Sequence, residues 1–292
     1  MTTLNSSARL KLDNILAATD LSSVSKAALL YAIPIARRHD AKLFIVHVSS
    51  SESHGNVGDA WRAAQTELMD YFMAGHFKGV RHELLVKSGD VWAVLSRLIA
   101  DYGIDLVVVG TRGRTGVAKF LLGSVAETIF RQSPCPVLTI GPSISGQDPE
   151  VGPQRILVPT GFAPHSLYAV GYALWLAQEL RSSSFALLHV VTDRPGAQDQ
   201  ERIRKERLER LHAVISADER LPLRPECFVE FGSAPEKILE TAARWNPNLI
   251  VLGPHHIEEA SRKETTWARA YEIVCKAGCP VLTVRAPYRA TA

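Results

Sequence analysis

The chain repeats itself, and this duplication constrains its fold more than any other feature of its 292 residues. Four segments of one half recur in the same order in the other half, at a spacing that grows only from 141 to 144 residues. Chance similarity does not give four ordered matches with so small a drift, so we interpret the chain as one domain written twice. The matched segments begin at Asn14 and Arg155, Leu43 and Phe185, Asp105 and Asn248, and Cys135 and Cys279.

The duplication predicts two domains, one over residues 1–142 and one over residues 151–292. The stretch between the two copies is polar and contains Gly and Pro, which is typical of a linker. Each copy has an ordinary domain length, and 46% of the residues are hydrophobic, so each copy can build a core of its own.

The charge balance excludes several classes of function. The chain has 33 Lys and Arg against 30 Asp and Glu, and a net charge of +3 does not indicate a dominant nucleic-acid partner. No apolar run reaches about 18 residues, so we expect no membrane-spanning helix. The N-terminal residues lack the apolar region of a secretory signal, and the four cysteines form no CxxC pair. We therefore expect a reduced, cytoplasmic protein.

Short apolar runs alternate with helical segments in both copies. The runs at 43–48 and 106–109 are rich in Val, Ile and Leu and do not alternate with polar residues, as in parallel strands buried on both faces. The sequence therefore predicts an α/β fold with a doubly wound parallel sheet in each domain. Ligands of such sheets bind beyond the carboxyl ends of the strands, at the switch point. The mixed-charge run at 200–211 predicts an exposed amphipathic helix.

Cap residues indicate where helices begin. Ser22 or Ser23 is the expected N-cap of the helix after the first strand, and Pro34 predicts a kink or an early stop in that helix. Asp90 is an expected N-cap in the first copy. Ser233 marks the corresponding helix start in the second copy.

A glycine-containing loop follows the run at 106–109. It starts at Gly110, carries Arg112 and Gly113, and leads to Gly123 and Ser124 before a helical segment. Glycines let a backbone approach a ligand closely, and the N–H groups of a helix N-terminus attract anions. The loop therefore favours phosphate binding. The alternative is that the glycines only form turns, because the spacing matches neither a Walker A loop nor a GxGxxG fingerprint.

Four separated elements together resemble the universal stress protein family over nearly the whole chain, as two tandem copies. They are the spacing Gly-x2-Gly-x9-Gly-Ser, the strand that starts at Cys135-Pro136, Thr19-Asp20 after the first strand, and the second strand ending near Val48. The resemblance implies Rossmann-like domains of the adenine nucleotide alpha-hydrolase type. It also implies ATP as ligand, with or without Mg2+, and pairing of the two domains through their last strands.

The resemblance also assigns residues to the ligand. Asp20 stands where the family contacts the ribose and adenosine part, with Ala18 and Thr19 beside it. Val48 stands where the backbone recognises adenine. From the residues alone, Asp20 is also expected as an N-cap of the following helix, a role that is compatible with ligand binding. The phosphate and ribose loop corresponds to Gly110, Gly113, Gly123 and Ser124, followed by Val125, with Arg112 as a cation in the loop.

The second copy departs from this pattern. Gly161 stands in place of Asp20, His256 in place of Gly113, and Trp267-Ala268 in place of Gly123-Ser124. We therefore predict that only the first copy binds ATP. We expect the loop with His255, His256, Glu258 and Glu259 to be solvated rather than to bind a metal ion. We expect Cys135 and Cys279 to be packing residues, and the alternative is a redox pair of Cys275 with Cys279. The recurrent His47 and His189 favour a hydrogen bond at a strand end over catalysis.

The function expected is that of an ATP-binding, nucleotide-dependent regulatory protein of the stress response. A slow ATPase and a nucleotide-independent interaction module are the alternatives, and no catalytic residue and no metal ligand is assigned. The expected partners are an adenine nucleotide and the other domain of the same chain, through the terminal strands at 137–140 and 281–284. A further homodimer is left open, and neither nucleic acid nor a membrane is expected.

Overall fold

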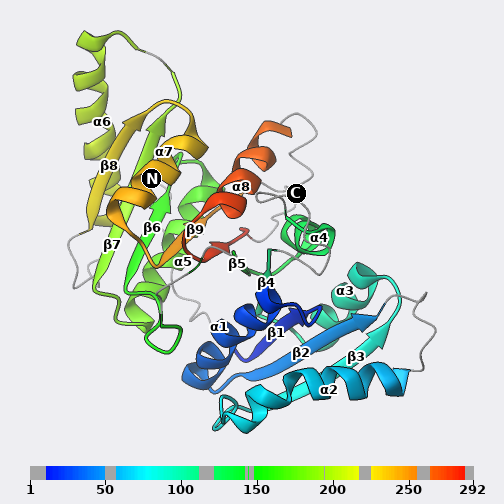
Figure 1. Cartoon of the computed structure of the whole chain (residues 1–292). Coiled ribbons are helices and arrows are strands. Elements are labelled where there is room, and N and C mark those ends of the chain that lie inside the picture. The colour runs from blue at the N-terminus through cyan, green and yellow to red at the C-terminus, as the bar shows by residue number, and fades with distance from the viewer. Residues whose placement is uncertain are drawn as a thin grey trace, which may run out of the picture. The chain divides into compact units, whose positions relative to one another are not determined.

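The computed structural model divides the chain into two compact units, a first unit over residues 11–152 and a second unit from residue 153 onward (Figure 1). It describes residues 11–49, 57–111, 122–141, 144, 148–193, 195–216, 225–254 and 264–286. Each unit is an α/β domain with a parallel sheet and four described helices, which confirms the predicted fold class.

The first unit has the strand order β3-β2-β1-β4-β5. The chain leaves β1 in one direction and returns to its other side at β4, so the switch point lies between these two strands. The strands are β1 (Asn14–Thr19), β2 (Lys42–Ser49), β3 (His82–Ser88), β4 (Leu106–Gly110) and β5 (Val137–Ile140). The helices are α1 (Ser23–His39), α2 (Val57–Met73), α3 (Val91–Asp101) and α4 (Ser124–Gln132).

The second unit repeats this order as β8-β7-β6-β9-β10. Its switch point therefore lies between β6 and β9, which correspond to β1 and β4. The strands are β6 (Arg155–Pro159), β7 (Ser184–Val191), β8 (Glu226–Phe231), β9 (Leu249–Leu252) and β10 (Val281–Thr283). The helices are α5 (Pro164–Glu179), α6 (Ala197–Ser216), α7 (Ala234–Trp245) and α8 (Glu264–Lys276).

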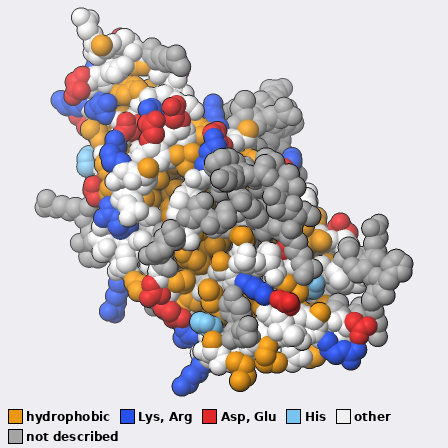
Figure 2. Space-filling model, viewed as in Figure 1, with side chains coloured by type: hydrophobic (Ala, Val, Ile, Leu, Met, Phe, Trp, Pro, Cys, Tyr) orange, Lys and Arg blue, Asp and Glu red, His pale blue; other side chains and the backbone are white. Residues whose placement is uncertain are grey.

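Helices cover both faces of each sheet, as right-handed crossovers require. In the first unit α3 packs beside α4, and Lys26 of α1 forms an ion pair of 2.7 Å with Glu67 of α2. In the second unit α7 packs beside α8. The run at 200–211 lies in α6, where Leu211 is fully buried, and Figure 2 shows side chains of both charges together over this helix. The predicted amphipathic helix is confirmed.

The helix starts mostly follow the predicted caps. Ser22 caps α1 and its Oγ accepts from the N–H of Ser25 at 3.3 Å, while Asp90 caps α3. Ser233 occupies the N-cap of α7 without a side-chain cap bond to the described backbone. The early stop at Pro34 is wrong, because α1 continues to His39. The buried apolar face of α1 against the sheet outweighs the one hydrogen bond that proline removes.

Two glycines at equivalent places let a helix approach the sheet. A Cβ on Gly110 would lie 3.0 Å from the carbonyl carbon and oxygen of Val24 in α1. A Cβ on Gly253 would lie 2.4 Å from the carbonyl oxygen of His165 in α5. Because both copies need this close packing, the fold itself explains why a glycine follows the central strand in each copy.

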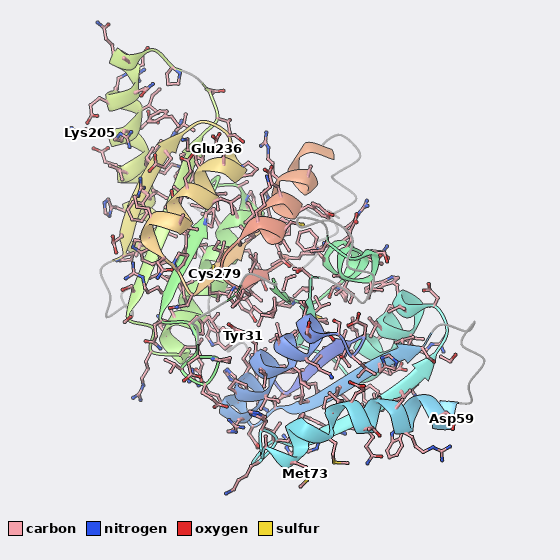
Figure 3. The ribbon with its side chains drawn as sticks, in the orientation of Figure 1. Tyr31, Asp59, Met73, Lys205, Glu236 and Cys279 are labelled. Carbon is pink, nitrogen blue, oxygen red and sulfur yellow. The ribbon has the colours of Figure 1, made fainter. Side chains whose placement is uncertain are left out.

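Cys279 is a packing residue, as the sequence predicts. It lies two residues before β10 and is 5% exposed (Figure 3). Burial raises the pKa of Cys279 to about 12 and that of Cys227 to about 11. Cys135, at the equivalent place in the first unit, is half-buried, and burial raises the pKa of its thiol as well. All four cysteines are free thiols.

We expect Gly253→Ala and Gly110→Ala to lower the free energy of unfolding by about 1–3 kcal/mol, because the new methyl group overlaps helix backbone. The loss should be larger for Gly253→Ala, where the approach is closer. Urea unfolding followed by far-UV circular dichroism measures both. Gly161→Ala is the matched control, because its Cβ meets no atom within 4 Å. Midpoints equal to that of the control would contradict the packing role.

The raised thiol pKa values predict slow alkylation. At pH 8 a thiol with a pKa of about 12 is ionised in roughly one molecule in ten thousand, and the thiolate is the reactive form. We expect iodoacetamide to modify Cys279 most slowly in the folded protein and all four cysteines at similar rates in concentrated urea. Mass spectrometry of the digested protein measures each site. Equal rates for Cys279 in both conditions would show that it is accessible.

Candidate functional site

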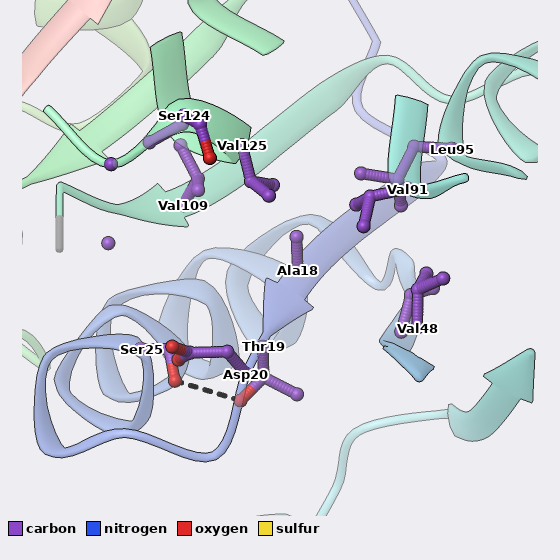
Figure 4. A pocket seen from close by; sticks show the side chains of 14 residues that line it. Ala18, Thr19, Asp20, Ser25, Val48, Val91, Leu95, Val109, Ser124 and Val125 are labelled. Atoms are coloured by element: carbon purple, nitrogen blue, oxygen red, sulfur yellow. Dashed lines mark hydrogen bonds between the residues drawn. The ribbon is translucent and has the colours of Figure 1, made fainter. Parts of the chain in front are cut away.

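A pocket of about 220 Å³ lies beyond the carboxyl ends of β1, β2 and β4, at the switch point of the first unit (Figure 4). All of the predicted site residues that the structure describes line it. This pocket therefore brings together segments that lie up to about a hundred residues apart in the sequence. The predicted residues in the lining are Ala18, Thr19, Asp20, Val48, Gly110, Gly123, Ser124 and Val125.

The other two predicted residues, Arg112 and Gly113, lie outside the described residues. The structure also adds apolar residues that sequence reasoning missed. Val91 and Leu95 project from the first turns of α3. In Figure 4 they lie with Val48 on one side of Ala18, while Val125 lies on the other side. Their spacing of four residues on one face of a helix was the available signal. The remaining lining residues are Ser25, Val46, Val109 and Ala126.

A network of short polar contacts shapes the turn between β1 and α1. The hydroxyl groups of Thr19 and Ser25 lie 2.9 Å apart, and Thr19 Oγ1 accepts from the N–H of Leu21 at 3.0 Å. Leu21 has a φ of +67°, an uncommon conformation for this residue, and the hydrogen bond to Thr19 helps to hold it there. The ring nitrogen Nδ1 of His47 lies 2.9 Å from the carbonyl oxygen of Thr19.

Asp20 lies in this turn and lines the pocket. Its Oδ1 accepts from the N–H of Ser22 at 3.1 Å. Because Ser22 is the N-cap of α1, the expected N-cap role of Asp20 is wrong. Asp20 is the sole ionisable side chain among the described lining residues, and it is half-buried.

The opposite wall of the pocket is the start of α4. Gly123 is the N-cap, and no described side chain caps this helix. The N–H groups of its first turn, beside Ser124 and Val125, are therefore available to a ligand, and the helix dipole favours an anion there. The N–H of Gly123 donates to the carbonyl oxygen of Thr111 at 2.8 Å, which fixes the entry of the loop into the helix.

The second unit keeps the turn. The hydroxyl groups of Thr160 and Ser166 lie 3.1 Å apart, and Thr160 Oγ1 accepts from the N–H of Phe162, whose φ is +62°. His189 Nδ1 lies 2.9 Å from the carbonyl oxygen of Thr160, as His47 does from that of Thr19. The predicted hydrogen bonds at the strand ends are confirmed, and their recurrence makes them part of the fold.

The second unit differs where the ligand would lie. Gly161 stands where Asp20 stands, and α8 begins at Glu264, so Trp267 and Ala268 lie inside the helix. The first unit has its N-cap and the first residue of α4 at the matching positions. The loop with His255, His256, Glu258 and Glu259 lies outside the described residues. Among the described residues, no group of three or more His, Cys, Asp or Glu could hold a metal ion.

No helix in the described part of the chain is both long and apolar enough to cross a membrane. Several solved structures match nearly the whole chain. A universal stress protein from Archaeoglobus fulgidus is 18% identical, with 95% of this chain and 98% of that one covered and a TM-score of 0.69. A universal stress protein from Pseudomonas aeruginosa is 17% identical, with 95% of each chain covered and a TM-score of 0.65. These likenesses support the fold.

The sequence comparisons give the family. A relative from Staphylococcus haemolyticus, itself named as a universal stress protein, is 33% identical over 138 residues, which are 44% of this chain and 83% of that protein. The profile described as Universal stress protein family matches twice, over residues 11–141 and 153–285. These two matches take up most of the chain, one in each copy of the repeat. The chain therefore belongs to the universal stress protein family, in a tandem two-domain form.

Proposed function

We propose that the pocket of the first unit binds ATP and that the bound nucleotide regulates the protein. The observation that carries the proposal is the convergence of three different surfaces on one pocket: apolar walls, a carboxylate and an open helix N-terminus. The walls formed by Val48, Val91 and Leu95 suit a flat purine ring. Asp20 suits a ribose hydroxyl group, since carboxylates accept hydrogen bonds from such groups.

The start of α4 suits the phosphates. Its N–H groups and Ser124 offer donors to an anion at the positive end of the helix dipole. Asp20 is the one carboxylate among the described lining residues, so a Mg2+ ion would be held mainly by the phosphates. This lining favours binding over hydrolysis, because Asp20 is the one described lining residue that could act as a general base.

Several features support the view that the second unit does not bind ATP in this way. It lacks the carboxylate of Asp20, and α8 continues through the positions that match Gly123 and Ser124. The second unit would then act as a partner or a regulatory domain. Pairing of the terminal strands β5 and β10 remains a prediction, motivated by the need to cover apolar strand edges.

We expect isothermal titration calorimetry of the full chain with ATP to give one site per chain. The structural reason is that the three surfaces converge in the first unit only, among the described residues. Two equivalent sites per chain would contradict the restriction to the first unit. No heat of binding, together with no nucleotide released on denaturation, would contradict ATP binding altogether.

Asp20→Asn should weaken ATP binding by about five- to tenfold, because a hydrogen bond to a charged acceptor becomes one to a neutral acceptor. The amide oxygen can still accept from the N–H of Ser22, so the turn should persist. The control is Asp90→Asn, which keeps a good N-cap for α3 outside the pocket lining. Equal affinities for the two variants would exclude the role of Asp20 in binding.

A further inference from the structure

The second unit carries arginines where the first unit carries other residues. Leu68 of α2 and Leu211 of α6 are both fully buried and occupy equivalent positions, 143 residues apart. The residue before Leu68 is Glu67, whereas the residue before Leu211 is Arg210. By the same spacing, the buried Ala64 of the first unit corresponds to Arg207 in the second. The helix that crosses this part of the sheet has therefore reversed one charge and gained another.

Arg210 reaches the carboxyl edge of the second sheet. Its guanidinium carbon lies 4.2 Å from the centre of the Phe162 ring, and Phe162 follows β6 in the turn described above. The Phe162 ring in turn lies 4.5 Å from the His189 ring, centre to centre. Arg210, Phe162 and His189 thus form one stack at the edge where the first unit has its pocket. Lys205 on the same helix points away from the sheet (Figure 3).

Arg207 adds a buried donor that has no partner. Its Nε is buried and makes no hydrogen bond to any described residue. Its Nη1 lies 3.2 Å from the carboxylate of Glu206, which is 56% exposed, so this ion pair uses another nitrogen and is screened by water. A buried N–H group without a partner is costly, and an anion that displaces the groups covering it would satisfy it. A guanidinium group can donate to an oxyanion through two nitrogens at once.

The positive charges of both arginines act on His189. Burial lowers the pKa of His189, and the charges of Arg207 and Arg210 lower it further, against the hydrogen bond to Thr160 that raises it. His189 Nδ1 is occupied by the carbonyl oxygen of Thr160, and Nε2 has no hydrogen-bond partner among the described residues. An imidazole and two guanidinium groups therefore lie near one another at this edge.

We propose that Arg207 and Arg210, together with His189, form an anion site at the carboxyl edge of the second unit that binds a phosphoryl group. The site is separate from the pocket of the first unit, and it does not depend on whether that pocket binds ATP. It takes the place of the nucleotide site that the second copy lacks. Its ligand is a small phosphorylated compound or a phosphate ion, recognised by the charge and the tetrahedral oxygens of the phosphoryl group.

Nuclear magnetic resonance of the His189 ring tests this site directly. We expect inorganic phosphate and pyrophosphate, added to the full chain at constant ionic strength, to shift the ¹H–¹³C signal of this ring in a saturable way. The signal is assigned by its loss in His189→Gln. Because the readout is local to the second unit, phosphate bound by the first unit does not mimic it.

Arg207→Gln and Arg210→Gln should each weaken this binding at least fivefold. Arg202→Gln is the matched control, since Arg202 lies on the same helix and is exposed and paired with Asp199 at 3.1 Å. Arg210→Lys keeps the charge without the planar guanidinium group, so it should bind phosphate with intermediate affinity. It replaces Arg210→Gln in the test if Arg210→Gln unfolds the domain. Circular dichroism checks the fold of each variant.

Three results would overturn the proposal. One is a shift of the His189 signal that chloride at the same ionic strength reproduces. Another is unchanged phosphate affinity in folded Arg207→Gln and Arg210→Gln, which would mean that these arginines only pack on aromatic rings. The third is that citrate binds as tightly as pyrophosphate. The site would then not be specific for a phosphoryl group, because carboxylates would serve equally well.

Discussion

The hydroxyl group of one threonine at the end of the central strand organises the whole edge of each sheet. Thr19 Oγ1 meets the hydroxyl group of Ser25 and accepts the N–H of Leu21, while the Thr19 carbonyl oxygen is held by His47. These bonds fix the direction in which α1 leaves β1. The position of α1 then determines where Asp20 lies and how closely the helix approaches Gly110. The pocket of the first unit depends on this turn.

The duplication separates what the fold needs from what a ligand needs. Thr160, Ser166 and His189 repeat the same contacts in a unit that has no counterpart of Asp20. These residues are therefore requirements of the turn. The same reasoning applies to Gly110, because Gly253 meets helix backbone in the same way. The first unit is distinguished by Asp20 and by the later start of its last helix, α4, at Ser124. Both Asp20 and Ser124 line the pocket.

Much of this organisation could be predicted from the sequence, because its signals are local and occur twice. The apolar runs predicted the strands, and Ser22 and Asp90 predicted two helix starts. Gly110, Gly123 and Ser124 could be predicted from the glycine-containing loop itself, at a sheet edge where ligands bind. The other five described site residues came from the resemblance to the family: Ala18, Thr19, Asp20, Val48 and Val125. The contribution of Val91 and Leu95 could not be predicted in the same way. It depends on how α3 packs against the sheet, which no short motif encodes.

The start of α8 and the environment of Arg207 were also beyond sequence reasoning. An alignment matches residues but does not show that a helix begins a turn earlier, at Glu264. The charge pattern at 200–211 indicates an exposed helix, and it describes α6 correctly as a whole. Whether one arginine of that helix has a buried Nε depends on the neighbouring strands and turn. Tertiary contacts decide this, so the sequence alone leaves it open.

Matching positions of the two units differ in charge, although the turn after the central strand is the same in both. Asp20 and Glu67 of the first unit correspond to Gly161 and Arg210 of the second, yet the hydrogen bonds of the turn are alike. A side chain that is not needed for the turn can change without loss of the fold. Duplication thus gives one chain two differently charged edges on a single architecture.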